Sequence, residues 1–274
     1  MRRPSRLVLL GHPVDHSLSP AFQNAALKRA GIPLVYGTLD VLGPDLAGTV
    51  RLLAEDRAAG NVTIPHKEAM AALCDVRTPL AERVGAVNTF WVDDGGRLNG
   101  HNTDVGGVIA LFDQLLGAPP LGRIALLGAG GAAAAVLAAL DGRPACSVTL
   151  YNRSPVRSAK LAERFPVVTR TTESPEDAVR DATLVINASP AGLEDDEMPV
   201  AIEALRFDAA IADLVYRRGE TPWVRAARAC GHRAADGLPM LIEQGALAFE
   251  SWFGVAAPRD AMWDAVTMEP TDAR

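Results

Sequence analysis

Two ionisable side chains in the first part of the chain have the chemistry of an acid-base pair. Lys67 ends the segment Asn61-Val62-Thr63-Ile64-Pro65-His66-Lys67, and Asp104 ends Gly100-His101-Asn102-Thr103-Asp104. Lysines are scarce, with three among 27 basic residues, and a lysine can release its proton in a protein whereas an arginine cannot. If the two side chains meet, the carboxylate orients the ammonium while both hold a reacting hydroxyl. The structural alternative for Asp104 is a helix N-cap.

Hydroxyl and amide side chains accompany this pair and predict a site for a polar, anionic substrate. Ser17 and Ser19 lie two apart in an extended segment, so both hydroxyls can meet one carboxylate. Ser19 followed by Pro20 also has the pattern of a helix N-cap, which is the structural alternative. Thr63 stands where a strand meets a helix, and Asn88 lies in Gly85-Ala86-Val87-Asn88-Thr89 on the next expected strand.

A glycine-rich turn near the middle of the chain predicts a dinucleotide site. Gly128, Gly130 and Ala133 follow a strand-like run over 123–127 and match the pattern G-x-G-x-x-A. The first glycine permits the tight turn, the second lets the backbone approach a pyrophosphate, and the small third residue lets helix pack on strand. A plain helix contact between small residues is the alternative. A second strand-like run over 148–151 favours the dinucleotide.

The residues after that second run favour NADP over NAD. NAD enzymes usually place an acid about 20 residues beyond the fingerprint, where it accepts from the ribose hydroxyl. This chain has Asn152, Arg153 and Ser154 there, with Arg157 following, and guanidinium groups suit the 2′-phosphate that an acid would repel. The alternative is a solvated helix face. The predicted contacts are Gly128, Ala129, Gly130, Gly131, Ala132, Asn152, Arg153, Ser154 and Arg157.

The elements that must position these residues alternate between strands and helices, which predicts an α/β protein with mainly parallel sheets. A Gly-Pro-rich stretch over 117–122 indicates a domain boundary. Strands are expected at 6–11, 33–41, 60–64, 84–92, 97–101, 123–127, 146–151, 166–169, 183–188 and 209–213, with helices at 104–116 and 240–253. The strands at 84–92 and 97–101 are expected to form a hairpin.

Length and composition exclude several classes of protein. The chain has 274 residues, 49% hydrophobic and 22% charged, which suits two folded domains. A net charge of −6 argues against nucleic-acid binding, and no apolar run approaches the roughly 20 residues of a membrane span. The three cysteines show neither disulfide nor zinc spacing, and His12 and His16 straddle Pro13, so we expect no metal and a cytoplasmic protein.

Taken together and in order, these motifs resemble the shikimate dehydrogenase family along nearly the whole chain. The resemblance implies NADPH-dependent, reversible reduction of 3-dehydroshikimate to shikimate in aromatic amino-acid biosynthesis, by a monomer or homodimer. It also implies a substrate-binding and catalytic domain of residues 1–105 plus 239–274, and a Rossmann NADP-binding domain of residues 106–238. The last helices would then return to the first domain.

The resemblance also implies a role for each site residue. Lys67 and Asp104 are the catalytic pair, Ser17 and Ser19 bind the substrate carboxylate, and Leu214 and Gly237 lie along the nicotinamide. The residues that contact the remainder of the substrate are Thr63, Asn88, Tyr216 and Gln244.

Four departures from the family pattern leave the substrate open. Gln23 stands where histidine is common, Ser154 replaces threonine, Asn187-Ala188-Ser189-Pro190 replaces a run richer in threonine and serine, and Gly245 stands where alanine is frequent. A quinate/shikimate or aminoshikimate dehydrogenase is therefore an alternative. A non-catalytic NADPH-binding module is a further one, although the retained Lys67 and Asp104 argue against it.

Overall fold

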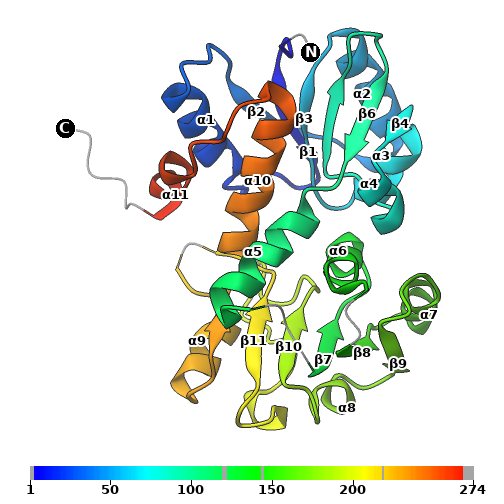
Figure 1. Ribbon diagram of the computed structural model, residues 1–274, viewed down its shortest axis with the longest axis vertical. Coiled ribbons are helices and arrows are strands. Elements are labelled where there is room, and N and C mark those ends of the chain that lie inside the picture. Colours follow the sequence, from blue (N-terminus) through cyan, green and yellow to red (C-terminus); the bar gives the residue numbers. More distant parts are fainter. Residues whose placement is uncertain (1–2, 119–121, 143–144, 218, 268–274) are drawn as a thin grey trace. The chain divides into compact units, whose positions relative to one another are not determined.

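The computed structural model describes residues 3–118, 122–142, 145–217 and 219–267 (Figure 1). It divides into two compact units, one of residues 1–104 with 241–274 and the other of residues 105–240. No helix in these described ranges is long and apolar enough to cross a bilayer. Residues 119–121 of the predicted linker lie outside the described residues.

The first unit is built on a mixed six-stranded sheet with the order β2-β1-β3-β5-β6-β4. β1 pairs in parallel with β2 and β3, whereas β5 pairs antiparallel with β3 and β6. The predicted hairpin is thus confirmed. The strands are β1 (Leu7–Gly11), β2 (Tyr36–Asp40), β3 (Ala59–Val62), β4 (Val76–Arg77), β5 (Thr89–Val92) and β6 (Leu98–His101).

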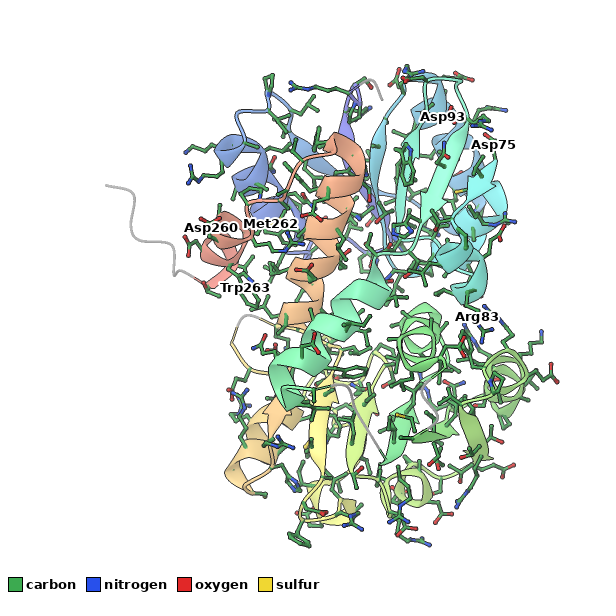
Figure 2. All side chains as sticks on the ribbon, viewed as in Figure 1. Asp75, Arg83, Asp93, Asp260, Met262 and Trp263 are labelled. Atoms are coloured by element: carbon green, nitrogen blue, oxygen red, sulfur yellow. The ribbon has the colours of Figure 1, made fainter. Side chains whose placement is uncertain are left out.

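Helices cover this sheet, and its central strands β1 and β3 are buried on both faces. Val8 and Leu10 of β1 join a core with α2, α3 and α4, while Leu7 and Leu9 are buried on the opposite face. α11 packs against α1 and buries Met262, which is labelled in Figure 2. The helices are α1 (Ser19–Arg29), α2 (Leu46–Glu55), α3 (Lys67–Leu73), α4 (Pro79–Val84), α10 (Leu238–Phe253) and α11 (Arg259–Thr267), with a short 3-10 turn η1 (Gly43–Asp45).

One expected strand of this unit was wrong over half its length. Residues 84–92 were predicted as a strand, but α4 ends at Val84 and β5 begins only at Thr89. Thr78 caps α4 by accepting from the Ala81 amide, Pro79 occupies the first turn, and Gly85 ends the helix with a φ of 67°. These cap signals were present in the sequence and outweigh the apolar run that suggested a strand.

The second unit has an all-parallel sheet with the order β12-β11-β10-β7-β8-β9. The chain moves outward from β7 in one direction and then from β10 in the other, so a topological switch point lies between these two strands. This order is that of a Rossmann fold, as predicted. The strands are β7 (Gly122–Leu127), β8 (Cys146–Tyr151), β9 (Val168–Thr172), β10 (Leu184–Asn187), β11 (Ala210–Asp213) and β12 (Ala234–Ala235).

The helices of the second unit bury apolar faces against this sheet. Trp223 and Val224 of α9 pack with Val185 and Ile211 of the central strands. The helices are α5 (Asp104–Leu116), α6 (Gly131–Leu140), α7 (Pro155–Arg164), α8 (Pro175–Val179) and α9 (Pro222–Ala229), with a 3-10 turn η2 (Ile202–Ala204).

Candidate active site

Lys67 and Asp104 meet in the first unit, as a polar pair among buried residues. Lys67 Nζ lies 2.7 Å from Asp104 Oδ2, and the two side chains are 18% and 4% exposed. Asn88 Nδ2 donates to the other carboxylate oxygen, Asp104 Oδ1, at 2.8 Å. Both oxygens of Asp104 are therefore engaged, and the carboxylate is held as an acceptor that orients the lysine.

Local structure explains why Lys67 points where it does. Lys67 is the first residue of α3, and His66 immediately before it is buried. His66 Nε2 lies 2.6 Å from the Val41 carbonyl, which can only accept, so this ring nitrogen carries the proton. The anchored histidine thereby fixes the start of α3.

Asp104 begins α5, yet its side chain is not used as a helix cap. Its two oxygens are taken by Lys67 and Asn88 instead. The capping interpretation of this residue therefore does not describe its contacts.

Asn88 is held by a buried network that the sequence analysis did not assign to the site. Its Oδ1 accepts from the Thr103 amide at 2.8 Å and from Thr89 Oγ1 at 3.1 Å, while Asn61 Nδ2 donates to Thr89 Oγ1 at 3.0 Å. These contacts fix which end of the Asn88 amide faces Asp104. Asn61, Thr89 and Thr103 stand in the same motifs as Thr63, Asn88 and Asp104, but no local spacing in the sequence indicates that they contact one another.

Gln244 of α10 joins the same cluster. Asn88 Nδ2 lies 3.3 Å from Gln244 Oε1, and Gln244 Nε2 donates to the Leu241 carbonyl at 2.8 Å. Gln23 of α1 fixes this part of α10 by donating to the Gly245 carbonyl at 2.9 Å. A Cβ on Gly245 would lie 2.3 Å from Phe22 Cε2, so glycine is needed for this close approach of α1.

Ser17 and Ser19 lie in and after the connection from β1 to α1, and Thr63 directly follows β3. The expectation that Ser19 caps α1 is wrong, because Ser19 is the first helical residue and Leu18 occupies the cap position without a side-chain hydrogen bond. Ser17 Oγ instead accepts from the Ser19 amide at 3.2 Å. Thr63 is tied to β1 through its amide, which donates to the Leu10 carbonyl at 2.8 Å, and its methyl group fills the space above Gly11.

The glycine-rich turn of the second unit follows β7 at the switch point. Gly128 has a φ of +121°, and a Cβ there would lie 2.5 Å from the Ala188 carbonyl oxygen. A Cβ on Gly130, which precedes α6, would meet no atom within 4 Å, so the space before the helix amides is open. Ala133 is fully buried. A tight turn, an open helix start and a small packing residue fit the pyrophosphate of a dinucleotide.

The residues expected at the adenosine end lie directly after β8. Gly128 donates its amide to the Tyr151 carbonyl at 2.8 Å, which brings the loop after β8 beside the glycine turn. Asn152 Nδ2 donates to the Ser154 carbonyl at 3.1 Å, and Ser154 precedes the first residue of α7. Arg153 and Arg157 are exposed. Two exposed guanidinium groups at a helix start fit an added phosphate.

Leu214, Tyr216 and Gly237 belong to the second unit and follow its strands β11 and β12. A Cβ on Gly237 would lie 2.2 Å from the Leu214 carbonyl oxygen, and the Gly237 amide donates to the Val215 carbonyl at 2.9 Å. The two segments thus run in direct backbone contact. Tyr216 is half-buried, and the remaining residues expected to contact substrate all belong to the first unit.

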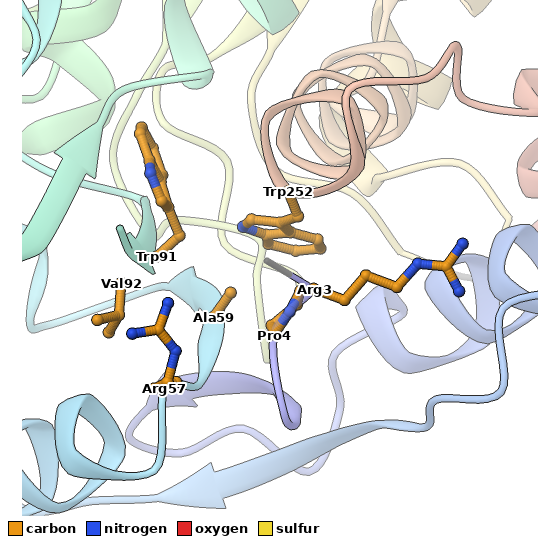
Figure 3. Close-up of a pocket in the computed structure, with 7 residues that line it drawn as sticks. All are labelled: Arg3, Pro4, Arg57, Ala59, Trp91, Val92 and Trp252. Atoms are coloured by element: carbon orange, nitrogen blue, oxygen red, sulfur yellow. The ribbon is translucent and has the colours of Figure 1, made fainter. Parts of the chain in front are cut away.

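A small hollow in the first unit lies away from the reacting pair. Figure 3 shows Trp91 and Trp252 on its sides, with Arg57 below them and the Arg3 guanidinium pointing out of it. Ala59, at the start of β3, also lines it, whereas Lys67 follows the opposite end of that strand. Across the described part of the chain, no group of three or more histidine, cysteine, aspartate or glutamate side chains is placed to hold a metal ion.

The fold and these sites define a dinucleotide-dependent oxidoreductase of the α/β class. Sequence profiles match at residues 9–90 for the shikimate dehydrogenase substrate binding domain and at residues 237–267 for the shikimate 5′-dehydrogenase C-terminal domain. The shikimate dehydrogenase (NADP(+)) of Symbiobacterium thermophilum is 41% identical over 95% of this chain and 93% of its own. The chain belongs to the shikimate dehydrogenase family.

Solved structures agree with this membership and mark its breadth. Shikimate 5-dehydrogenase from Thermus thermophilus, in complex with NADP(H) and shikimate, is 40% identical with a TM-score of 0.85, over 95% of this chain and 98% of that one. Quinate dehydrogenase from Corynebacterium glutamicum, in complex with NAD, is 29% identical with a TM-score of 0.86, over 96% and 99% of the two chains. The shared fold therefore supports more than one named substrate and cofactor.

Proposed function

We propose that this chain catalyses the reversible, NADPH-dependent reduction of 3-dehydroshikimate to shikimate in the shikimate pathway. It is an NADP-dependent oxidoreductase acting on a CH-OH group, as its relatives are named. The observation that carries the proposal is the contact of 2.7 Å between Lys67 Nζ and Asp104 Oδ2 beside the buried Asn88 amide. An ammonium held in this way can give a proton to a carbonyl oxygen that becomes a hydroxyl.

The chemistry divides between the cofactor and this chain's side chains. When bound, NADPH would supply the hydride for the carbonyl carbon, and the residue that donates the proton to the oxygen is Lys67, through Nζ. Asp104 is the weaker candidate for the proton donor, because both of its oxygens already accept hydrogen bonds. Its negative charge attracts the ammonium group and holds it in place.

The substrate contacts extend this arrangement. Ser17 and Ser19, with the first amides of α1, bind the carboxylate, which suits an anion at a helix start. Hydroxyl groups of the ring bind to the amides and hydroxyls that surround the reacting pair. The residues assigned to that role are Thr63, Asn88, Tyr216 and Gln244.

The second unit is assigned to NADP. The glycine turn, with the amides of Ala129, Gly131 and Ala132, holds the pyrophosphate, and Leu214 and Gly237 lie along the nicotinamide. Asn152, Ser154 and the two arginines, Arg153 and Arg157, bind the adenosine ribose and its 2′-phosphate. On this assignment the first unit is the substrate-binding and catalytic domain.

We also propose a cytoplasmic location and a monomeric or homodimeric state. The location is supported by the odd number and wide spacing of the three cysteines, and by Cys74, whose burial raises the pKa of its thiol to about 12 and keeps it unreactive. The state of association is checked by light scattering of the purified protein.

The decisive test of the proposed function is a set of specificity constants for the purified wild-type enzyme. Production of NADPH or NADH is followed with shikimate or quinate as the alcohol and NADP⁺ or NAD⁺ as the acceptor. Shikimate with NADP⁺ should give the highest kcat/KM. No turnover of shikimate would overturn the proposal, and a higher constant for quinate or NAD⁺ would replace its substrate or its cofactor.

A further inference from the structure

A buried carboxylate outside the reacting pair stands at the carboxyl end of β11. Asp213 is 1% exposed. Its Oδ1 accepts from Asn187 Nδ2 at 2.9 Å and from the Val215 amide at 3.1 Å, and its Oδ2 accepts from Thr221 Oγ1 at 2.7 Å. Three donors, one from the end of β10 and two from the connection between β11 and α9, therefore converge on one side chain.

Burying a carboxylate is energetically unfavourable, which indicates that Asp213 has a role other than stabilising the fold. Burial is the largest influence on it and raises the pKa of Asp213 to about 6, against the lowering effect of its hydrogen bonds. None of the ion pairs formed by the described residues includes Asp213. A desolvated acid without a cation is poor stabilisation compared with an apolar side chain, which points to a role in organising the loops around it.

The partners of Asp213 each control a loop at this edge of the parallel sheet. Asn187 Oδ1 accepts from the Ser189 amide at 3.0 Å, and Asn187 Nδ2 also donates to the Ala191 carbonyl at 3.2 Å, so the segment after β10 is held. Thr221 Oγ1 accepts from the Val224 amide at 3.3 Å and so caps α9. Asp213 joins these two segments to the one that follows β11.

The same segments carry the backbone expected beside the nicotinamide. The Leu214 amide donates to the Asn187 carbonyl at 2.9 Å, and the Val215 carbonyl accepts from the Gly237 amide at 2.9 Å. Val215 is thus held on one side by Asp213 and on the other by Gly237. Leu214 lies next to Val215, and these hydrogen bonds therefore fix its backbone position as well.

We propose that Asp213 is a positioning residue that sets the backbone of residues 214–216 as a preformed surface for the nicotinamide half of NADP. It touches neither substrate nor cofactor and acts through the Val215 amide and Thr221. This inference rests on the proposed function, which assigns Leu214 and Gly237 to the nicotinamide. Preorganisation of this kind raises affinity by removing the cost of ordering the loop on binding.

Two ligands separate the two halves of the cofactor in the test. Calorimetry gives the Kd of NADPH and of 2′-phospho-ADP-ribose, which lacks the nicotinamide, for Asp213→Ala and for the wild type. The expected result is a Kd for NADPH that rises about 10-fold, while that of the fragment changes by less than about 2-fold. Equal weakening of both ligands, or no change in either, would overturn the proposal.

Conservative variants distinguish positioning from loss of folding. Asp213→Asn keeps the shape and can keep the bonds from Asn187 and Val215, so it should recover most of the NADPH affinity. Thr221→Val removes one donor and should weaken NADPH about 3-fold, whereas Thr221→Ser should not. Asp208→Ala, at an exposed site before the same strand, is the matched control and should leave both affinities unchanged.

Binding of 2′-phospho-ADP-ribose and turnover by the wild type test the role of Asp213 and the proposed function separately. If shikimate is not a substrate, the wild type shows no turnover, whatever the variants bind. If Asp213 has no positioning role, the wild type is active and the two affinities of Asp213→Ala fail to diverge. Should Asp213→Ala not fold, Thr221→Val against Thr221→Ser carries the same comparison, and equal NADPH affinities for these two would overturn it.

Discussion

The two units of this enzyme use different chemical groups for their sites, side chains in the first unit and mainly backbone in the second. In the first unit the site is made of side chains, with Lys67, Asp104 and Asn88 oriented by buried hydroxyl and amide groups. In the second unit it is made largely of backbone, with Gly128 and Gly130 placing a turn and a helix start. Substitutions should therefore affect the reaction in one unit and cofactor affinity in the other.

The largest expected effect is on the reaction. Lys67→Ala should lower kcat by about 10²–10⁴-fold, the range that a general acid contributes, because the variant lacks the ammonium group that Asp104 holds. The Kd of NADPH should stay within about 2-fold of the wild-type value. Lys28→Ala, at an exposed lysine of α1, is the control for loss of a lysine and should keep full activity. Weakened NADPH binding in Lys67→Ala would contradict the claim that residues of the first unit affect the reaction and not cofactor affinity.

A pair of glycines tests the backbone site of the second unit. Gly128→Ala should lower the free energy of unfolding by about 1–3 kcal/mol and weaken NADPH, because the residue has a φ of +121° and its Cβ would collide with the Ala188 carbonyl. Gly130→Ala, with open space around its Cβ, should keep the unfolding midpoint yet weaken NADPH. Thermal unfolding and calorimetry measure the two effects. Equal stability losses in both variants would contradict this account.

On the proposed assignment, the arginines Arg153 and Arg157 set cofactor choice rather than the reaction. Arg153→Ala should reduce the preference for NADPH over NADH by about 10-fold, which corresponds to one charge-assisted hydrogen bond. Its effect should fade as salt is raised, because Arg153 is exposed. Arg225→Ala, at an exposed arginine of α9, is the control. An unchanged ratio of kcat/KM for the two cofactors would show that Arg153 does not bind the cofactor and is only part of a solvated helix face.

The smallest expected effect lies on the surface of the first unit at Asp93, which is labelled in Figure 2. Asp93 accepts from the Arg97 amide at 3.0 Å. This hydrogen bond is the strongest of several contacts with Arg97 and Asn99 that lower the pKa of Asp93 from 3.8 to about 2. A depressed pKa means that the stabilisation is present above pH 3.8 and is lost as the pH falls through 2. Asp93→Asn should thus have a slightly lower thermal unfolding midpoint than the wild type at neutral pH. If the difference in unfolding midpoint between variant and wild type is the same at about pH 2 as at neutral pH, the carboxylate of Asp93 is not its cause.

The sequence was informative where a residue type is tied to a local conformation or to one chemistry. Gly128 indicated a turn with a positive φ that only glycine forms easily, and the rarity of lysine singled out Lys67. The sequence could not reveal the Asn61, Thr89 and Thr103 network, because contacts between β3, β5 and the start of α5 depend on strand pairing and not on local spacing. The role of Asp213 was missed for a related reason, since its partner Asn187 lies 26 residues away on the neighbouring strand β10.

The central claim is that Lys67 and Asp104 act as one unit, and a double-mutant cycle tests it most directly. Values of kcat for shikimate oxidation are compared for Lys67→Ala, Asp104→Ala and the double variant. If the carboxylate works through the lysine, the double variant should lose no more activity than Lys67→Ala alone. Losses that multiply would show that the two residues act independently and would contradict the account.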